Sequence, residues 1–223
     1  MKALIHKSGI AIVVLTILLT IAGCQSVSTE QPTATLQPTN TPQPTATPQP
    51  TATPTLAPIL LIAQEASEDM ELMLTKEVGV MVSMLEKAGY EVVVASLSGQ
   101  PINGTSTTLT PDLKLADVNV DDYMGIILPC MAVPFEPTWP PSEAIEIVKI
   151  ALAQGKPMAA QVGGVVILDA AGALDGKHFA FPGDLMDIIS SNGIHEGDGV
   201  VQDGNIITSG ICPFLGSLTG QTD

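Results

Sequence analysis

Short apolar runs alternate with amphipathic segments through most of the chain after residue 58. Ile59–Ala63 is an unbroken apolar run directly after Pro58, which is typical of a strand buried in a parallel sheet. An acidic turn from Glu65 to Asp69 follows, and apolar residues then recur every three or four positions until Gly89. That spacing predicts an amphipathic helix that ends at the glycine.

The same alternation continues to the end of the chain. Further strands are predicted at Glu91–Ala95, Gly125–Leu128 and Met158–Gln161, and further helices begin at Ser142, as the capping residue, and at Gly163. Close to the end, Asp203-Gly204 separates two β-branched runs, which predicts a hairpin. We therefore expect one α/β domain over residues 59–223, with a doubly wound, mostly parallel sheet, helices on both faces, and ligands at the carboxyl ends of the strands.

The first 23 residues have the pattern of an export signal. Lys2 and Lys7 precede the apolar run Ile10–Ile21, which is shorter than the roughly 20 residues that a membrane-spanning helix needs. The run ends in Ile21-Ala22-Gly23-Cys24, which resembles the lipobox of bacterial lipoproteins, whose cysteine is diacylated on sulfur and becomes the mature N-terminus. The alternative is an uncleaved anchor with an incidental cysteine. The resemblance implies a signal peptide at 1–23, lipidation (palmitate) at Cys24, and a protein anchored to the cell membrane and facing away from the cytoplasm.

Residues 24–58 are predicted to be a tether. Eight of the 18 prolines lie between Ser28 and Pro58, and Gln43–Pro48 is repeated identically as Gln49–Pro54. Proline at this density favours an extended, semi-rigid polyproline II chain over a folded domain.

The composition excludes several partners and cofactors. Eight Lys and Arg residues stand against 23 Asp and Glu, for a formal net charge of −15. Nucleic acids and anionic lipid surfaces require clustered cations, so neither is an expected partner, and the predicted contact with the membrane is through the lipid on Cys24. No Cys-x-x-Cys pair, metal-ligand spacing or dinucleotide fingerprint is present, so neither a metal nor a cofactor is expected.

Several stretches, in order, resemble the DJ-1/PfpI family of class I glutamine amidotransferase-like proteins. They are residues 61–63 with 68–71, 85–92, 126–129, 155–160, 174–177 and 203–209. The resemblance covers about Ile59 to Ser209 and implies a flavodoxin-like fold. Family enzymes place a cysteine in the sharp turn after the strand that corresponds to Met158–Gln161, where a helix N-terminus activates its thiolate.

The chain departs from the family at that turn. Val162 takes the nucleophile position in Gln161-Val162-Gly163-Gly164, and the position of the usual histidine falls near Phe181. The paired glycines after the third strand, one of whose amides serves the oxyanion site, are replaced by Cys130-Met131. The acid that hydrogen-bonds the family nucleophile is matched by Glu71. The resemblance thus implies the family scaffold without its nucleophile.

Cys130 and Cys212 follow two strands at the same edge of the expected sheet. A disulfide, two unpaired buried thiols and a relocated nucleophile or redox centre are all compatible with the sequence. Two functions follow. In the favoured one, the former active-site crevice binds a small ligand or a protein partner without catalysis; in the alternative, Cys130 with Glu71 serves a thiol-dependent hydrolase, glyoxalase-like or redox enzyme.

The expected crevice contains Glu71, Cys130, Met131, Val162, Gly163 and Cys212. Partial burial beside Val162 is expected to raise the pKa of Glu71. The crevice would then prefer neutral polar or weakly anionic ligands, and binding would improve as the pH falls.

The chain stops 14 residues after Ser209, where family members usually continue through a further helix. Either a neighbouring subunit in a homodimer covers that face, or the chain is a truncated product.

Overall fold

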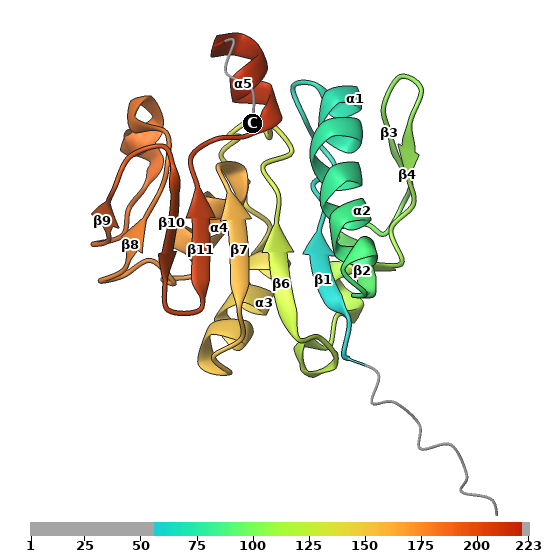
Figure 1. Ribbon diagram of the computed structural model, residues 1–223, viewed down its shortest axis with the longest axis horizontal. Helices are drawn as coiled ribbons and strands as arrows, with labels where there is room; N and C mark the ends of the chain where they lie inside the picture. The colour runs from blue at the N-terminus through green and yellow to red at the C-terminus, as the bar shows by residue number, and fades with distance from the viewer. Residues whose placement is uncertain (1–55, 220–223) are drawn as a thin grey trace, which may run out of the picture. The chain divides into compact units, whose positions relative to one another are not determined.

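The computed structural model describes residues 56–219, which fold around a seven-stranded sheet in the order β10-β11-β7-β6-β1-β2-β5 (Figure 1). Every neighbouring pair is parallel except β10 and β11, which form an antiparallel hairpin. The strands are β1 (Ile59–Ile62), β2 (Val92–Ser96), β5 (Leu113–Lys114), β6 (Gly125–Leu128), β7 (Met158–Gln161), β10 (Val200–Asp203) and β11 (Ile206–Ser209). The predicted single α/β domain with a mostly parallel sheet is confirmed.

The apolar run at the start of the domain forms the central strand. Leu60, Leu61 and Ile62 of β1 have no exposed surface, because β1 lies between β2 and β6 and is covered on both faces. Leu61 is in register with Val94 of β2 and Ile127 of β6. Continuous apolar runs are what a strand buried on both faces requires, which is why the sequence predicted the bounds of β6 and β7 correctly.

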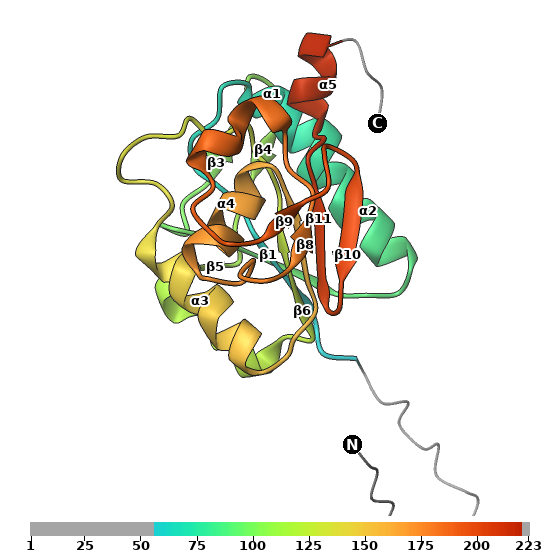
Figure 2. The same cartoon turned by 90° about the vertical axis from the view of Figure 1, so that its left-hand side faces the viewer.

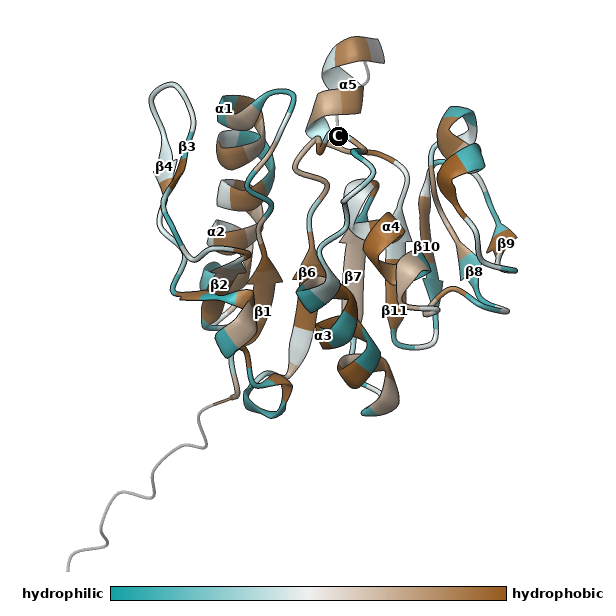
Figure 3. Cartoon of the chain, turned by 180° about the vertical axis from the view of Figure 1, so that it is seen from behind, coloured by the Kyte–Doolittle hydropathy of each residue, from teal (hydrophilic) through white to brown (hydrophobic). Residues whose placement is uncertain are grey.

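Helices cover both faces of this sheet. Helices α1 (Met70–Met73) and α2 (Gly79–Lys87) lie on one face, and α3 (Ser142–Ala153) and α4 (Gly163–Ala170) lie on the other (Figures 1 and 3). The strongly hydrophobic α4 contacts β6 and β7 and is almost wholly buried.

Two details of the helices differ from the sequence prediction. The helix predicted from the acidic turn to Gly89 begins as expected, with the Asp69 carboxylate accepting a hydrogen bond from the Leu72 N–H at 3.0 Å, but a π-helical turn at Leu74–Val78 interrupts it. The expected cap Ser142 is instead the first residue of α3, because Pro141 takes the capping position.

Smaller elements that the sequence did not predict complete the domain. They are the hairpin β3 (Ile102–Asn103) and β4 (Thr108–Leu109), the parallel pair β8 (His178–Phe179) and β9 (Ile194–His195), the 3-10 turns Leu115–Asp117, Val120–Asp122 and Gly183–Ile188, and helix α5 (Pro213–Thr219). Figures 1 and 2 show α5 beyond the carboxyl end of β11 and next to α1, at the edge where the loops after β6 and β7 also lie.

The predicted signal peptide at 1–23, the lipidation site Cys24 and nearly all of the tether at 24–58 lie outside the described residues and stay predictions. Within residues 56–219, no helix is long and apolar enough to cross a membrane.

Candidate functional site

The sharp turn between β7 and α4 is built as the sequence predicted. Val162 has φ +33° and ψ −93°, a conformation that a β-branched residue rarely adopts, and its N–H donates to the Ser209 carbonyl at 2.9 Å. The next two residues must be glycine. A Cβ on Gly163 would overlap the Cys130 carbonyl and one on Gly164 the Leu128 carbonyl, because α4 begins directly against the end of β6. The side chain at this turn is the buried, chemically inert isopropyl group of Val162.

A buried carboxylate holds the turn after β6. Glu77 is 2% exposed, and its two carboxylate oxygens accept hydrogen bonds from the N–H groups of Cys130 and Met131, each at 2.8 Å. Met131 and Ala132 have positive φ values of 53° and 45°, so this turn too is strained. The resemblance assigned an amide of this turn to the oxyanion site, and both amides are occupied by Glu77.

The structure contradicts the raised pKa that the sequence predicted for Glu71. Glu71, in α1, binds the turn of the β3–β4 hairpin. Its carboxylate accepts four hydrogen bonds of 2.7–3.0 Å from the N–H and hydroxyl groups of Ser106 and Thr107. The hydrogen bonds from Ser106, followed by those from Thr107, lower the pKa of Glu71 from 4.5 to about 2. The Glu71 carboxylate therefore faces the hairpin and its pKa is lowered, so the raised pKa on which the predicted pH dependence of the crevice rested is wrong.

Glu77 was not among the residues that the sequence singled out, because the family resemblance drew attention to Glu71, six residues earlier. A signal was nevertheless present. Glu77 falls between Leu74 and Met81 at helical spacing, so it occupies the apolar stripe of its own helix. A carboxylate on such a stripe is buried and needs donors, which the turn after β6 supplies.

Cys130 is a buried thiol in contact with Cys212. Its Sγ accepts a hydrogen bond from the Ala132 N–H at 3.3 Å and another from the Gly163 N–H. Both cysteines are thiols in the structure, which among the three predicted states corresponds to buried thiols without a disulfide. The hydrogen bond with the Cys212 side chain, reinforced by burial, raises the pKa of Cys130 far above the ordinary thiol range. The thiolate that nucleophilic chemistry needs is therefore disfavoured.

A pocket of about 270 Å³ opens beside this turn and contains part of the predicted crevice. Of the predicted residues, Cys130 and Val162 line it, whereas Met131, Gly163 and Cys212 are buried outside its lining and Glu71 lies elsewhere. The remaining lining residues are Glu68, Ala132, Val133, Pro134, Phe135, Leu185, Phe214 and Leu215. Its walls are apolar, and the exposed Glu68 is the charged group among its lining residues.

The histidines of the described residues have partners of their own. His178 Nδ1 lies 2.6 Å from a carboxylate oxygen of Glu196, and His195 Nε2 donates to the Phe181 carbonyl at 2.7 Å. Phe181, near which the resemblance places the family's histidine, is fully buried. Neither of these histidines is among the residues that line the pocket beside Val162.

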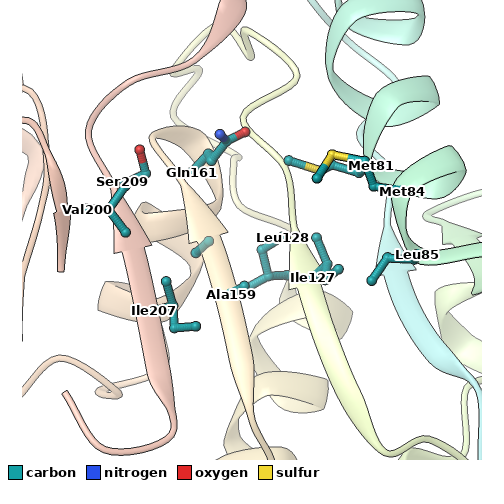
Figure 4. Close-up of a pocket in the computed structure, with 11 residues that line it drawn as sticks. Met81, Met84, Leu85, Ile127, Leu128, Ala159, Gln161, Val200, Ile207 and Ser209 are labelled. Atoms are coloured by element: carbon teal, nitrogen blue, oxygen red, sulfur yellow. The ribbon is translucent and has the colours of Figure 1, made fainter. Parts of the chain in front are cut away.

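A second hollow lies on the sheet face next to α2 (Figure 4). This groove has a volume of about 330 Å³ and runs between Met81, Met84 and Leu85 of α2 and the strands β6, β7, β10 and β11. Its lining is mostly apolar, with Gln161 and Ser209 as the polar residues, and Val200 is 72% exposed there.

Comparison with known proteins agrees with this architecture. The DJ-1/PfpI family model matches residues 57–213. An uncharacterized protein of Archaeoglobus fulgidus is 35% identical over 165 residues, which cover 73% of this chain and 94% of that protein. A deglycase of Pyrococcus abyssi is 32% identical over 153 residues, covering 68% of this chain and 88% of the deglycase. The chain belongs to the DJ-1/PfpI family.

Solved structures show the same fold at lower identity. The crystal structure of a ThiJ/PfpI domain protein from Brachyspira murdochii superposes with a TM-score of 0.61 at 19% identity, covering 75% of this chain and 97% of that one. DJ-1beta of Drosophila melanogaster gives a TM-score of 0.53 at 24% identity, over 69% and 81% of the two chains.

Proposed function

We propose that this protein is a non-catalytic member of its family that binds a small ligand in the crevice beside Val162. One observation carries the proposal: the strained turn between β7 and α4 is intact, yet the side chain at its apex is a valine. Valine can neither attack a carbonyl nor transfer a proton.

The surroundings of Val162 support the same conclusion. The amides of Cys130 and Met131 bind Glu77, and the Gly163 amide binds the Cys130 sulfur. These three N–H groups are therefore already hydrogen-bonded within the protein and are not free to stabilise an oxyanion. In catalytic sites, by contrast, such donors point at the reacting atom.

The walls of the crevice define the kind of ligand. Apolar side chains dominate, and Glu68 at the rim is a carboxylate that repels anions. The ligand is therefore a neutral or cationic molecule with an apolar body, in place of the neutral polar or weakly anionic one that the sequence predicted.

The proposal extends to location. The lysines before Ile10–Ile21 and the lipobox-like Ile21–Cys24 support export and lipid attachment at Cys24. Mass spectrometry of the N-terminal peptide of the native protein tests this, and an intact Met1 or an unmodified Cys24 contradicts it.

An enzymatic alternative rests on the relatives named deglycases, and it requires the Cys130 thiol in place of the missing nucleophile. A deglycase assay on a glycated amino acid separates the two, with the Pyrococcus abyssi deglycase as the positive control. We expect the wild-type chain and its Cys130→Ser variant to remain at the buffer rate. Wild-type turnover within tenfold of the control that Cys130→Ser abolishes would refute the proposal.

A further inference from the structure

A separate cavity lies next to the crevice, at the carboxyl end of β1. It has a volume of about 130 Å³ and shares Val133 and Pro134 with the crevice. Its other lining residues are Ala63, Gln64, Glu65, Ala66, Leu97, Leu115, Trp139 and Pro141. Most of this wall is apolar, so its few polar atoms decide what the cavity can hold.

Gln64 supplies a buried donor to this wall. Its side chain belongs to a residue that is 6% exposed, and its Oε1 accepts a hydrogen bond from Trp139 Nε1 at 3.1 Å. An indole N–H can only donate, so the amide oxygen must face Trp139 and the amide nitrogen must point away from it. That nitrogen, Nε2, is buried and has no acceptor among the described residues. Leaving a buried donor without an acceptor is unfavourable, so this atom marks a place for an acceptor from outside the chain.

The other polar residue of the wall excludes anions. The Glu65 carboxylate accepts hydrogen bonds of 2.6–2.8 Å from Ser96 Oγ and from the N–H and Oγ of Ser98. Burial acts to raise the pKa of Glu65, but these hydrogen bonds outweigh it and lower the pKa. No Lys, Arg or His lines the cavity to balance this negative charge.

Water alone fits the cavity poorly. One water molecule occupies about 30 Å³ of liquid, so a cavity of this volume would need about four, each with two to four polar partners. The apolar wall does not offer that many. An apolar cavity of about 150 Å³ holds a six-carbon ring, so a molecule of about six heavy atoms is of the right size.

We propose that this cavity binds a small neutral carbonyl compound, a ketone, aldehyde or amide of about six heavy atoms, whose oxygen accepts a hydrogen bond from Gln64 Nε2. The apolar remainder packs against Leu115, Val133 and Trp139. This site is additional to the crevice beside Val162 and does not depend on what the crevice binds.

Cyclopentanone is a suitable probe, since it has six heavy atoms and one acceptor. Trp139 is the single tryptophan of the chain, so its indole N–H gives one unambiguous peak in a ¹⁵N-correlated NMR spectrum. Titration of the full chain should shift this peak and the Gln64 side-chain amide peaks with one saturable, millimolar Kd. Absence of saturable shifts up to 50 mM, as expected for a cavity that holds water only, would overturn the proposal.

Gln64→Met tests the donor directly. Methionine has nearly the same length and a sulfur that can weakly accept from Trp139, but no donor. We expect its Kd for cyclopentanone to rise at least tenfold, while Glu68→Gln, in the crevice, keeps the wild-type value. A Gln64→Met variant with an intact indole peak and a Kd within twofold of wild type would refute the proposed hydrogen bond. Loss of binding in Glu68→Gln would show that the probe binds in the crevice instead.

Discussion

Val162 combines a demanding backbone conformation with an inert side chain. A positive φ costs a β-branched residue on the order of 1–3 kcal/mol, so the surrounding contacts must over-determine this turn. They do so from two sides, through the Ser209 carbonyl and through the close approach of Gly163 and Gly164 to β6. The residue held in this conformation is apolar, and it forms part of the wall of the crevice.

Glu77 is expected to matter for stability more than any exposed carboxylate. Replacing it by leucine leaves the N–H groups of Cys130 and Met131 buried without acceptors, which should lower the free energy of unfolding by about 2–5 kcal/mol. Glu86→Leu, an exposed position on the same helical segment, should stay within about 0.5 kcal/mol of wild type. Urea denaturation measures both, and equal stabilities of the two variants would contradict the role given to Glu77.

The stability that Glu71 gives to the β3–β4 hairpin depends on pH. Its pKa is about 2 in the fold and 4.5 without the hairpin contacts, so the ionised form stabilises the folded state. This contribution is fully present above about pH 4.5 and is lost as the pH falls toward 2. The stability difference between wild type and Glu71→Gln should therefore be constant above pH 5 and shrink below pH 4.5.

Carboxyl-carbon NMR gives a direct check of the same prediction. Ser106→Ala removes the hydrogen bond that lowers the pKa of Glu71 most, so the titration midpoint of Glu71 should move upward from about 2. A wild-type midpoint near 4.5 is the result that would contradict the hairpin contacts.

At the scale of elements, the sequence was most informative where burial alone decides structure. The apolar runs of β1, β6 and β7 predicted three strands, and the hairpin β10–β11 followed from Asp203-Gly204. The pairs β3–β4 and β8–β9 were missed because strands of two residues are too short to show a period. Their stability comes from tertiary contacts such as those of Glu71 with Ser106.

The candidate site was predicted only in part, for a related reason. Spacing along the chain located Val162 and Cys130, since Val162 follows β7 directly and Cys130 comes two residues after the end of β6. Glu71 was paired with Cys130 on the family resemblance, whereas the carboxylate that accepts from the Cys130 N–H belongs to Glu77, in the π-helical turn Leu74–Val78, which has no marker in the sequence. Which side chain contacts a residue across the fold depends on irregular helical turns of this kind as much as on the residues next to it in the sequence.

The close packing of α4 against β6 can be tested by mutation. Gly164→Ala would force a methyl group into the Leu128 carbonyl, and backbone cannot yield as a flexible side chain can. We expect a loss of at least about 2 kcal/mol of unfolding free energy, or failure to fold. Gly199→Ala is the matched control, since nothing lies within 4 Å of its added Cβ, and it should differ from wild type by less than about 0.5 kcal/mol. A stable Gly164→Ala variant would contradict the tight helix–strand contact.

At the scale of the whole molecule, the negative net charge and the apolar groove of Figure 4 have opposite effects on self-association. A net charge of −15 opposes the approach of a second copy, while an apolar face favours burial. The homodimer expected from the sequence stays a prediction, with this groove as the face to examine.

The chain enters the domain at Pro58, whose carbonyl accepts from the Met124 N–H at the amino end of β1. Val162 and Cys130 lie at the carboxyl ends of β7 and β6, which is the opposite edge of the parallel sheet. Under the proposed anchoring at Cys24, the attachment point and the mouth of the crevice are therefore on opposite sides of the domain. Deleting one hexapeptide repeat, Gln49–Pro54, should change ligand affinity by less than twofold in vesicle-bound protein, and a tenfold change would contradict this geometry. If the protein is anchored as proposed, the crevice samples solutes from the bulk medium, because it opens at the edge of the sheet opposite the point where the tether enters the domain.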